Sequence, residues 1–205
     1  MDLSELRTIA ARKPAGLEEL SDRLVFGTGD PDATLMLIGE APGADEDLAG
    51  EPFVGRAGQL LDQILDSVGL DRHSIWITNI VKFRPPGNRN PTPAEIEASE
   101  GILLEEIRLV NPQVIAPLGN VPNQYLLGTR EGITRLHGQW AEFRGIRVMP
   151  LFHPAYLLRN PSRTQGSPKW QMWQAMTALK AELDTLGPKT GRNGISSARQ
   201  EGLFG

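Results

Sequence analysis

Four side chains of different chemistry stand out in this 205-residue chain. Glu40 supplies a carboxylate, Asn79 a carboxamide, His153 an imidazole and Phe53 an aromatic ring. A carboxylate can deprotonate a water molecule, and an imidazole can donate a hydrogen bond to developing negative charge. A carboxamide both donates and accepts, so it can read the polar edge of a flat ligand on which a ring stacks. We therefore predict a cavity that holds a planar ligand beside a carboxylate.

The polar members of this set are far apart in the sequence, but each lies near the end of an apolar run typical of a buried strand. The four runs of this kind are residues 33–38, 75–81, 113–118 and 147–152. Helical patterns fill the intervals between them, so strands and helices should alternate. This order predicts an α/β fold with three α/β/α layers and a central, mainly parallel four-stranded sheet. Ligands bind at the carboxyl ends of the strands in such sheets.

The helices carry signals of their own. Apolar residues recur at helical spacing over residues 60–68, and Gly69 is a typical C-terminal stop. Thr92 opens a capping-box pattern that predicts the start of a second helix. Further helices are expected at residues 121–127 and 169–186.

The composition is that of a folded, water-soluble chain. Hydrophobic residues make up 40% of it, and no apolar run approaches the roughly 20 residues of a membrane helix. We expect no secretory signal. Residues 1–186 are assigned to one domain, whereas residues 187–205, rich in Gly, Ser and Arg, are expected to be disordered. The chain contains no cysteine, which excludes disulfides and thiolate catalysis, and its three scattered histidines lack metal-ligand spacing.

The distribution of charge differs from its average. The formal net charge of −4 argues against nucleic acid as a partner. Residues 76–94 and 153–170, however, contain no Asp or Glu, so an acidic average can conceal a basic face. The cations of these two stretches are Lys82, Arg84, Arg89, Arg159, Arg163 and Lys169.

Taken singly, each of these features also has a purely structural interpretation. The glycine-rich loop at residues 39–43 can be an ordinary turn, Phe53 a core residue, His153 a helix cap, and the basic loops merely solvated. Asn79 within an apolar strand needs a specific partner under either interpretation. The functional interpretation depends on the joint occurrence of the motifs.

Five motifs occur in an order and spacing that resemble the uracil-DNA glycosylase superfamily, and in particular its bacterial and archaeal family 4. The resemblance covers residues 24–183. Its motifs are Gly39-Glu40-Ala41-Pro42-Gly43, Pro52-Phe53-Val54-Gly55-Arg56-Ala57-Gly58, Thr78-Asn79-Ile80-Val81-Lys82, Arg84-Pro85-Pro86-Gly87-Asn88-Arg89 and His153-Pro154-Ala155-Tyr156-Leu157. The resemblance implies an enzyme that flips uracil out of DNA and hydrolyses its N-glycosidic bond, leaving an abasic site.

The resemblance also implies roles for individual residues. Glu40 and His153 would be catalytic: the carboxylate positions or deprotonates water, and the imidazole donates to uracil O2. Phe53 would stack on the base, and Asn79 would read its O4 and N3–H groups, which cytosine does not match. The uracil-binding set is Gly39, Ala41, Glu46, Phe53 and Asn79. Within it, Glu46 is expected to help exclude the methyl group of thymine.

A second implied set contacts DNA outside the base pocket. Leu157 or Leu158 would act as a wedge that takes the place of the extruded base. Arg159 and Arg163 would meet phosphates, and the proline-rich loop, residues 84–89, would add further contacts with the DNA backbone. The predicted DNA-binding residues are Arg84, Asn88, Arg89, Leu157, Leu158, Arg159 and Arg163.

The chain departs from family 4 at the iron–sulfur site. Typical members bind a 4Fe–4S cluster through four cysteines, and the corresponding positions here are Arg12, Ala15, Phe83 and Ser99. We therefore predict no cofactor and no metal. In the family the cluster braces a loop away from the base pocket, so its loss threatens loop stability more than chemistry. Packing by Phe83 is our hypothesis for the compensation.

These observations predict a monomeric, monofunctional uracil-DNA glycosylase without an iron–sulfur cluster, acting on uracil-containing DNA in the cytoplasm near the nucleoid and not on a membrane. Two alternatives remain open. One is a non-catalytic or product-retaining binder of uracil-containing or abasic DNA. The other is a hydrolase of small nucleotides that uses residues 39–43 as a phosphate loop, although the chain lacks the lysine-containing P-loop pattern.

Overall fold

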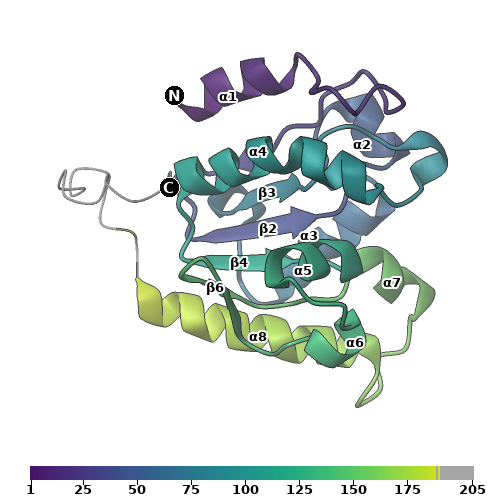
Figure 1. The fold of residues 1–205 in the computed structure, drawn as a ribbon. Helices are drawn as coiled ribbons and strands as arrows, with labels where there is room; N and C mark the ends of the chain where they lie inside the picture. Colours follow the sequence, from purple (N-terminus) through teal and green to yellow (C-terminus); the bar gives the residue numbers. More distant parts are fainter. Residues whose placement is uncertain (188, 190–205) are drawn as a thin grey trace.

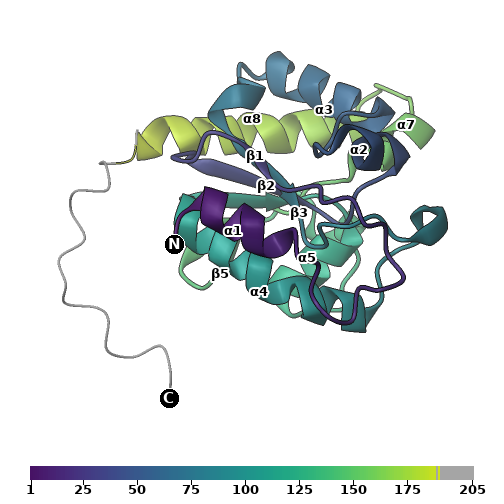
Figure 2. The same ribbon diagram turned by 90° about the horizontal axis from the view of Figure 1, so that it is seen from above.

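The computed structural model describes residues 1–187 and residue 189. A mixed sheet lies in the middle of the molecule and helices cover both of its faces (Figures 1 and 2). The predicted three-layer α/β/α class is therefore confirmed. The predicted disordered segment 187–205 lies outside the described residues, apart from residues 187 and 189.

The sheet contains six strands in the order β1-β3-β2-β4-β6-β5. Its four inner strands run parallel and correspond to the four predicted runs, while the edge strands β1 and β5 pair antiparallel with their neighbours. The two edge strands were not predicted from the sequence. The bounds are β1 Thr28–Gly29, β2 Leu35–Gly39, β3 Trp76–Asn79, β4 Val114–Pro117, β5 Ala141–Phe143 and β6 Ile146–Val148.

Two apolar cores lie on opposite faces of the sheet because side chains alternate along each strand. Leu35 and Leu37 of β2 pack with the helices α3, α7 and α8, whereas Met36 and Ile38 pack with α1, α4 and α5. The bounds of the helices are α1 Leu3–Ala10, α2 Ala44–Ala49, α3 Arg56–Ser67, α4 Pro93–Val110, α5 Asn120–Leu127, α6 Ile133–Leu136, α7 Pro154–Arg159 and α8 Pro168–Leu186.

The sequence signals account for the long helices. Thr92 and Glu95 form the predicted capping box at the start of α4, each accepting a hydrogen bond from the backbone N–H of the other. The short helices α2, α6 and α7 and the N-terminal α1 were not predicted. Among the described residues, no helix combines the length and the apolar character needed to cross a membrane.

The chain path creates a crevice at one edge of the sheet. From β2 the chain crosses by α3 to β3 on one side, and from β3 it returns by α4 to β4 on the other side of β2. The strand order thus reverses around β2, and such a reversal opens a ligand-binding crevice beyond the carboxyl ends of the strands. The loops that follow β2, β3 and β6 surround this crevice.

Candidate active site

A cavity of about 670 Å³ occupies the crevice at the carboxyl ends of the central strands. It brings together residues that are more than one hundred positions apart in the sequence. Six of the seven predicted catalytic and uracil-binding residues line it, and the seventh, Gly39, lies beside them at the end of β2. The six are Glu40, Ala41, Glu46, Phe53, Asn79 and His153.

Asn79 ends β3 and points its side chain toward the cavity. The residue is 2% exposed, and its Oδ1 atom has no hydrogen-bond partner among the described residues. An unpaired buried acceptor costs about 1–3 kcal/mol, so a ligand that supplies the missing N–H is favoured at this point.

Phe53 lies against Asn79 in the same cavity. A Cβ atom at Gly39 would come within 2.2 Å of Asn79 Oδ1 and 2.7 Å of the Phe53 ring, so only glycine permits this convergence. Phe53 itself has a φ of 55°, a strained value for an aromatic residue. Glu46 stabilises this loop, since its Oε1 accepts hydrogen bonds from the N–H groups of Val54 and Gly55 at 3.0 and 2.8 Å. The ring is thereby held as one wall of the cavity.

His153 both caps the helix α7 and lines the cavity. Its Nδ1 accepts a hydrogen bond from the N–H of Ala155 at 3.1 Å and so caps α7. Burial, together with the nearby Arg159 charge, lowers the pKa of His153 to about 4, against the smaller opposing effect of Glu46. The imidazole is therefore neutral at pH 7, and because Nδ1 is an acceptor its proton lies on Nε2. His153 can donate from Nε2, and its ring centroid is 5.7 Å from that of Phe53.

Glu40 follows β2 directly and is half-buried at the cavity wall. Burial raises the pKa of its carboxyl group above the ordinary value of 4.5. Its carboxylate forms no hydrogen bond or ion pair within residues 1–187 and 189, which leaves it available to a water molecule or a ligand. A carboxylate in this state is suited to general-base chemistry.

Lys82, counted in the basic stretch 76–94, is not on the surface but only 1% exposed. Its Nζ donates to the hydroxyl of Thr78 and to the backbone carbonyl of Asn79, both at 2.6 Å, and forms an ion pair with Glu106. Glu106 also accepts from Trp76 Nε1 at 2.9 Å. Burial lowers the pKa of Lys82, and the Glu106 carboxylate opposes that effect. This pair could not be predicted from the sequence, because its members are 24 residues apart.

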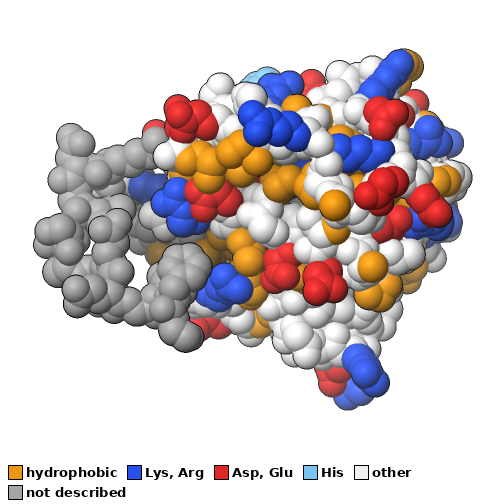
Figure 3. All heavy atoms as spheres, turned by 45° about the horizontal axis from the view of Figure 1, so that its top comes forward, with side chains coloured by type: hydrophobic (Ala, Val, Ile, Leu, Met, Phe, Trp, Pro, Cys, Tyr) orange, Lys and Arg blue, Asp and Glu red, His pale blue; other side chains and the backbone are white. Residues whose placement is uncertain are grey.

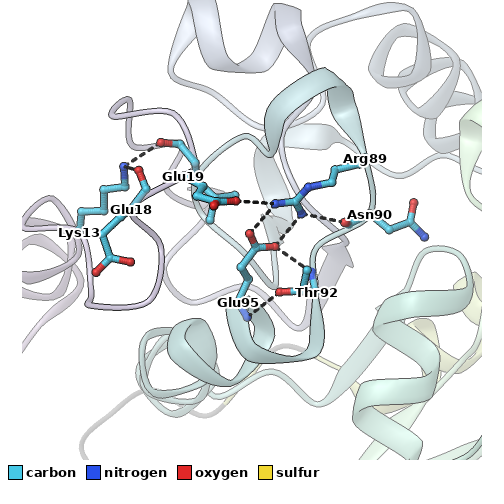
Figure 4. Close-up of polar contacts among 8 residues, drawn as sticks. Lys13, Glu18, Glu19, Arg89, Asn90, Thr92 and Glu95 are labelled. Atoms are coloured by element: carbon cyan, nitrogen blue, oxygen red, sulfur yellow. Dashed lines mark hydrogen bonds and ion pairs between the residues drawn. The ribbon is translucent and has the colours of Figure 1, made fainter.

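The proline-rich loop also differs from the expectation that its cations are free for DNA. Arg84 donates from Nε to Oδ1 of Asn88 at 2.6 Å. Arg89 forms a bidentate pair with Glu95, at 2.8 and 2.7 Å, and lies 3.9 Å from Glu19 (Figure 4). The charge of the Arg89 guanidinium is thus balanced by carboxylates of the protein, although the residue is partly exposed and lines the cavity.

The two candidate wedge residues differ in exposure. Leu157 is 1% exposed and packs into the core with α3 and α8, so it is not available to DNA. Leu158 is 37% exposed, and the neighbouring Arg159 is exposed at the cavity wall. Arg163 lies apart from this cavity, at a second one beside α8.

The four positions that correspond to the family's cluster cysteines do not fit such a cluster. Phe83 is a core residue and Ser99 is buried, whereas Arg12 and Ala15 are exposed. None can supply a thiolate. Within the described residues, no group of three or more His, Cys, Asp or Glu side chains is placed to hold a metal ion. Lys13 lies over the Phe83 ring, with its Nζ 5.9 Å from the ring centroid.

Charge is mixed on the face that carries α1 and α4. Acidic and basic side chains lie beside one another there (Figure 3). This face therefore does not attract DNA as a block of one sign.

Comparisons with known proteins agree with the site. A family model described as the uracil DNA glycosylase superfamily matches residues 26–177, which include every residue of the cavity. A type-4 uracil-DNA glycosylase of Thermotoga maritima is 44% identical over 141 residues, 68% of this chain and 73% of that protein. A type-4 uracil-DNA glycosylase of Archaeoglobus fulgidus is 38% identical over 76% of this chain and 82% of its own length. A type-5 uracil-DNA glycosylase of Pyrobaculum aerophilum is 31% identical over 66% and 67%, respectively.

Proposed function

The chain belongs to the uracil-DNA glycosylase superfamily, and we propose that it removes uracil from DNA by hydrolysing the N-glycosidic bond. The observation that carries the proposal is the buried, unpaired Oδ1 of Asn79 beside the Phe53 ring. A ligand that satisfies it must be flat and must present an N–H group on its edge. Uracil that has been flipped out of DNA meets both conditions.

Asn79 selects uracil over cytosine. Its Oδ1 accepts from uracil N3–H, and its Nδ2 donates to uracil O4. Cytosine has an unprotonated N3 and an amino group at the same places. The acceptor Oδ1 would then face the acceptor N3, and the donor Nδ2 would face the donor amino group. A site built for such hydrogen bonds rejects the mismatched ligand strongly because buried polar groups are left unpaired.

His153 stabilises the leaving group. When the bond between C1′ and uracil N1 breaks, its electron pair passes to N1 and the negative charge spreads to O2 and O4. The neutral imidazole donates from Nε2 to O2, where this charge develops. Because its pKa is lowered to about 4, His153 keeps this form throughout the neutral range.

Glu40 completes the hydrolysis. Its carboxylate takes a proton from water as the water oxygen bonds to C1′, and its negative charge also stabilises the cationic sugar. Uracil leaves as an anion and is protonated by solvent, while Glu40 returns its proton to solvent. The products are free uracil and an abasic site, with no lysine in the role of nucleophile.

We extend the proposal to the form in which the protein works. Residues 1–186 act as one monomeric domain on uracil-containing DNA, in the cytoplasm near the nucleoid and without an iron–sulfur cluster. The absence of cysteine from the whole chain supports the last point. Purified protein should be colourless and free of iron.

A glycosylase assay tests the function. The protein is incubated with a labelled oligonucleotide that contains one uracil, and abasic sites are then cleaved with alkali. We expect cleavage by the parent protein and severe loss in Glu40→Ala and His153→Ala, with their thermal unfolding checked as a control. Tight binding without cleavage would instead identify a non-catalytic binder, and turnover of free nucleotides alone would identify a small-molecule hydrolase.

A further inference from the structure

A second cavity, of about 430 Å³, lies outside the proposed active site. It is formed between α3 and α8, with α7 beside it, on the helical layer that Figure 2 shows on one side of the sheet. Two of its lining residues, Leu157 and Arg163, were expected to contact DNA, but neither that expectation nor the family match assigns a ligand to the cavity itself.

Two tryptophans of α8, Trp170 and Trp173, line this cavity. Trp173 is 52% exposed, which is unusual for the largest apolar side chain. The buried Leu157 and Met172 form its floor. The cavity therefore presents flat aromatic surface to solvent above an apolar base.

The rim of the cavity is basic. Arg163 and Lys169 line it, and neither forms an ion pair with any described residue. No acidic residue lines it, and the chain contains no Asp or Glu at all from residue 143 to residue 181. Unneutralised cations beside exposed rings are the combination that binds single-stranded nucleic acid, through phosphates and stacked bases.

The helix α7 joins this cavity to the active site. Tyr156 and Arg159 of α7 line the first cavity, and Leu157 lines the second. The exposed Leu158 lies between Leu157 and Arg159 in the sequence. A helix with its side chains is about 10 Å across. Successive phosphates advance at least about 3.4 Å along a strand. A strand whose uracil occupies the first cavity therefore reaches the second within about three nucleotides.

We propose that the second cavity is a nucleotide subsite. It binds one nucleotide of the uracil-containing strand, about two or three positions from the uracil, with the base stacked on Trp173 and a phosphate held by Arg163 and Lys169. This inference rests on the proposed function, since it takes DNA as the ligand. It gives the enzyme a contact with single-stranded DNA that requires no base pairing and little sequence preference.

A length series tests the subsite. Single-stranded oligonucleotides carry one uracil and gain nucleotides one at a time, first on its 5′ side and then on its 3′ side. We expect kcat/KM to rise about fivefold or more when one side reaches the subsite, because base–aromatic stacking has that magnitude. The Trp173→Ala variant should lose this step while excising uracil from the shortest oligonucleotide as well as the parent does. Trp173→Phe, which keeps a ring, should restore part of it.

Tryptophan fluorescence gives a readout that does not depend on catalysis. A uracil-free single-stranded oligonucleotide should quench the parent protein, and Trp173→Ala should remove most of that quenching. Trp140→Ala is the matched control, because Trp140 is also partly exposed but lines neither cavity. Lys169→Gln should reduce the salt dependence of oligonucleotide binding by about one phosphate contact.

The outcomes separate the subsite from the function. The subsite would be overturned, and the glycosylase function left intact, if the parent excises uracil but kcat/KM shows no step with oligonucleotide length. The same holds if the oligonucleotide quenches Trp173→Ala as strongly as it quenches the parent. Quenching that needs Trp173 but no excision would overturn the function and support DNA at this cavity. Quenching by an Asp-rich peptide with an aromatic end, and not by the oligonucleotide, would overturn the subsite in favour of a protein partner.

Discussion

Lys82 holds the backbone of Asn79, the residue whose side chain lines the proposed uracil site. Its ammonium group donates to the backbone carbonyl oxygen of Asn79 at 2.6 Å, and its other two protons go to Thr78 and Glu106. An ammonium group has three donors, so all of them are used. Because Lys82 and Glu106 are 1% and 0% exposed, the end of β3 is tied to α4 by a buried ion pair.

Replacement of this pair should separate stability from positioning. Lys82→Met leaves Glu106 charged and unpaired in the core, which should lower the free energy of unfolding by about 3–5 kcal/mol. The double variant Lys82→Met/Glu106→Leu should recover part of that loss, since apolar residues often replace buried pairs at little cost. The recovery should be incomplete because Trp76 Nε1 and the Thr78 hydroxyl lose their acceptor. Excision by the double variant should remain roughly 10- to 100-fold slow, because the Asn79 carbonyl has lost its donor. Denaturant unfolding measures the effect on stability, and kcat/KM measures the effect on positioning. If the double variant has the same kcat/KM as the parent protein, the pair has only a structural role.

Asn79→Asp should change the base preference. A carboxylate cannot donate to uracil O4, so uracil excision should fall about a hundredfold or more. The ratio of cytosine to uracil excision should rise, because the carboxylate accepts from the cytosine amino group. Matched oligonucleotides with one uracil or one cytosine measure this ratio. Asn123→Asp is the control, since Asn123 is equally buried outside the cavity, and the idea fails if both variants shift the ratio alike.

The pH dependence of excision should report Glu40. Its raised pKa means that Glu40 becomes protonated, and so inactive as a base, at a higher pH than an ordinary glutamate. His153 stays neutral down to its pKa of about 4. As the pH falls, the rate should therefore decline first with an apparent pKa above 4.5, before His153 is protonated. Glu40→Gln should abolish this decline and slow excision roughly 10²- to 10⁴-fold. An unchanged acid limb in the variant would assign it to another group.

The fold and the site could be predicted from the sequence to different extents. The inner strands β2, β3 and β4 were predictable because each coincides with a buried apolar run, and β6 begins the fourth run, which continues past it. The edge strands β1 and β5 have two and three residues and lie in no apolar run. Glu40, Asn79 and His153 could be grouped from the sequence because each lies at or beyond the carboxyl end of an inner strand, and the parallel sheet brings these ends to one cavity.

The partners and the exposure of individual side chains could not be predicted from the sequence. Lys82 and Arg89 lie in an acid-free stretch, but their partners Glu106 and Glu95 come from α4, so a count of local charge misassigned both. The choice between Leu157 and Leu158 depended on the phase of the short helix α7, which was not predicted. Only the packing of α7 against α3 shows which leucine faces the core.

Phe83 should contribute substantially to stability at the position of a family cysteine. It is 1% exposed and packs in the core with α1 and α4. Phe83→Ala should therefore lower the free energy of unfolding by about 3–5 kcal/mol through lost burial and the cavity left behind. Denaturant unfolding measures this loss, with the half-buried Phe143→Ala as the matched control. A Phe83→Ala protein as stable as the parent would refute the hypothesis that packing replaces the cluster.

Arg89 should behave as a loop brace and not as a phosphate contact. Its guanidinium donates twice to Glu95, and this pairing lowers the pKa of Glu95 to about 2. Because Glu95 takes up protons at higher pH when unfolded than when folded, its contribution to stability is present at neutral pH and is lost as the pH falls from about 4.5 to about 2. Arg89→Gln should remove this part of the acid unfolding profile. It should leave the salt dependence of DNA binding unchanged, whereas Arg159→Gln should reduce that slope by about one. A reduced slope in Arg89→Gln would show that DNA draws Arg89 away from Glu95.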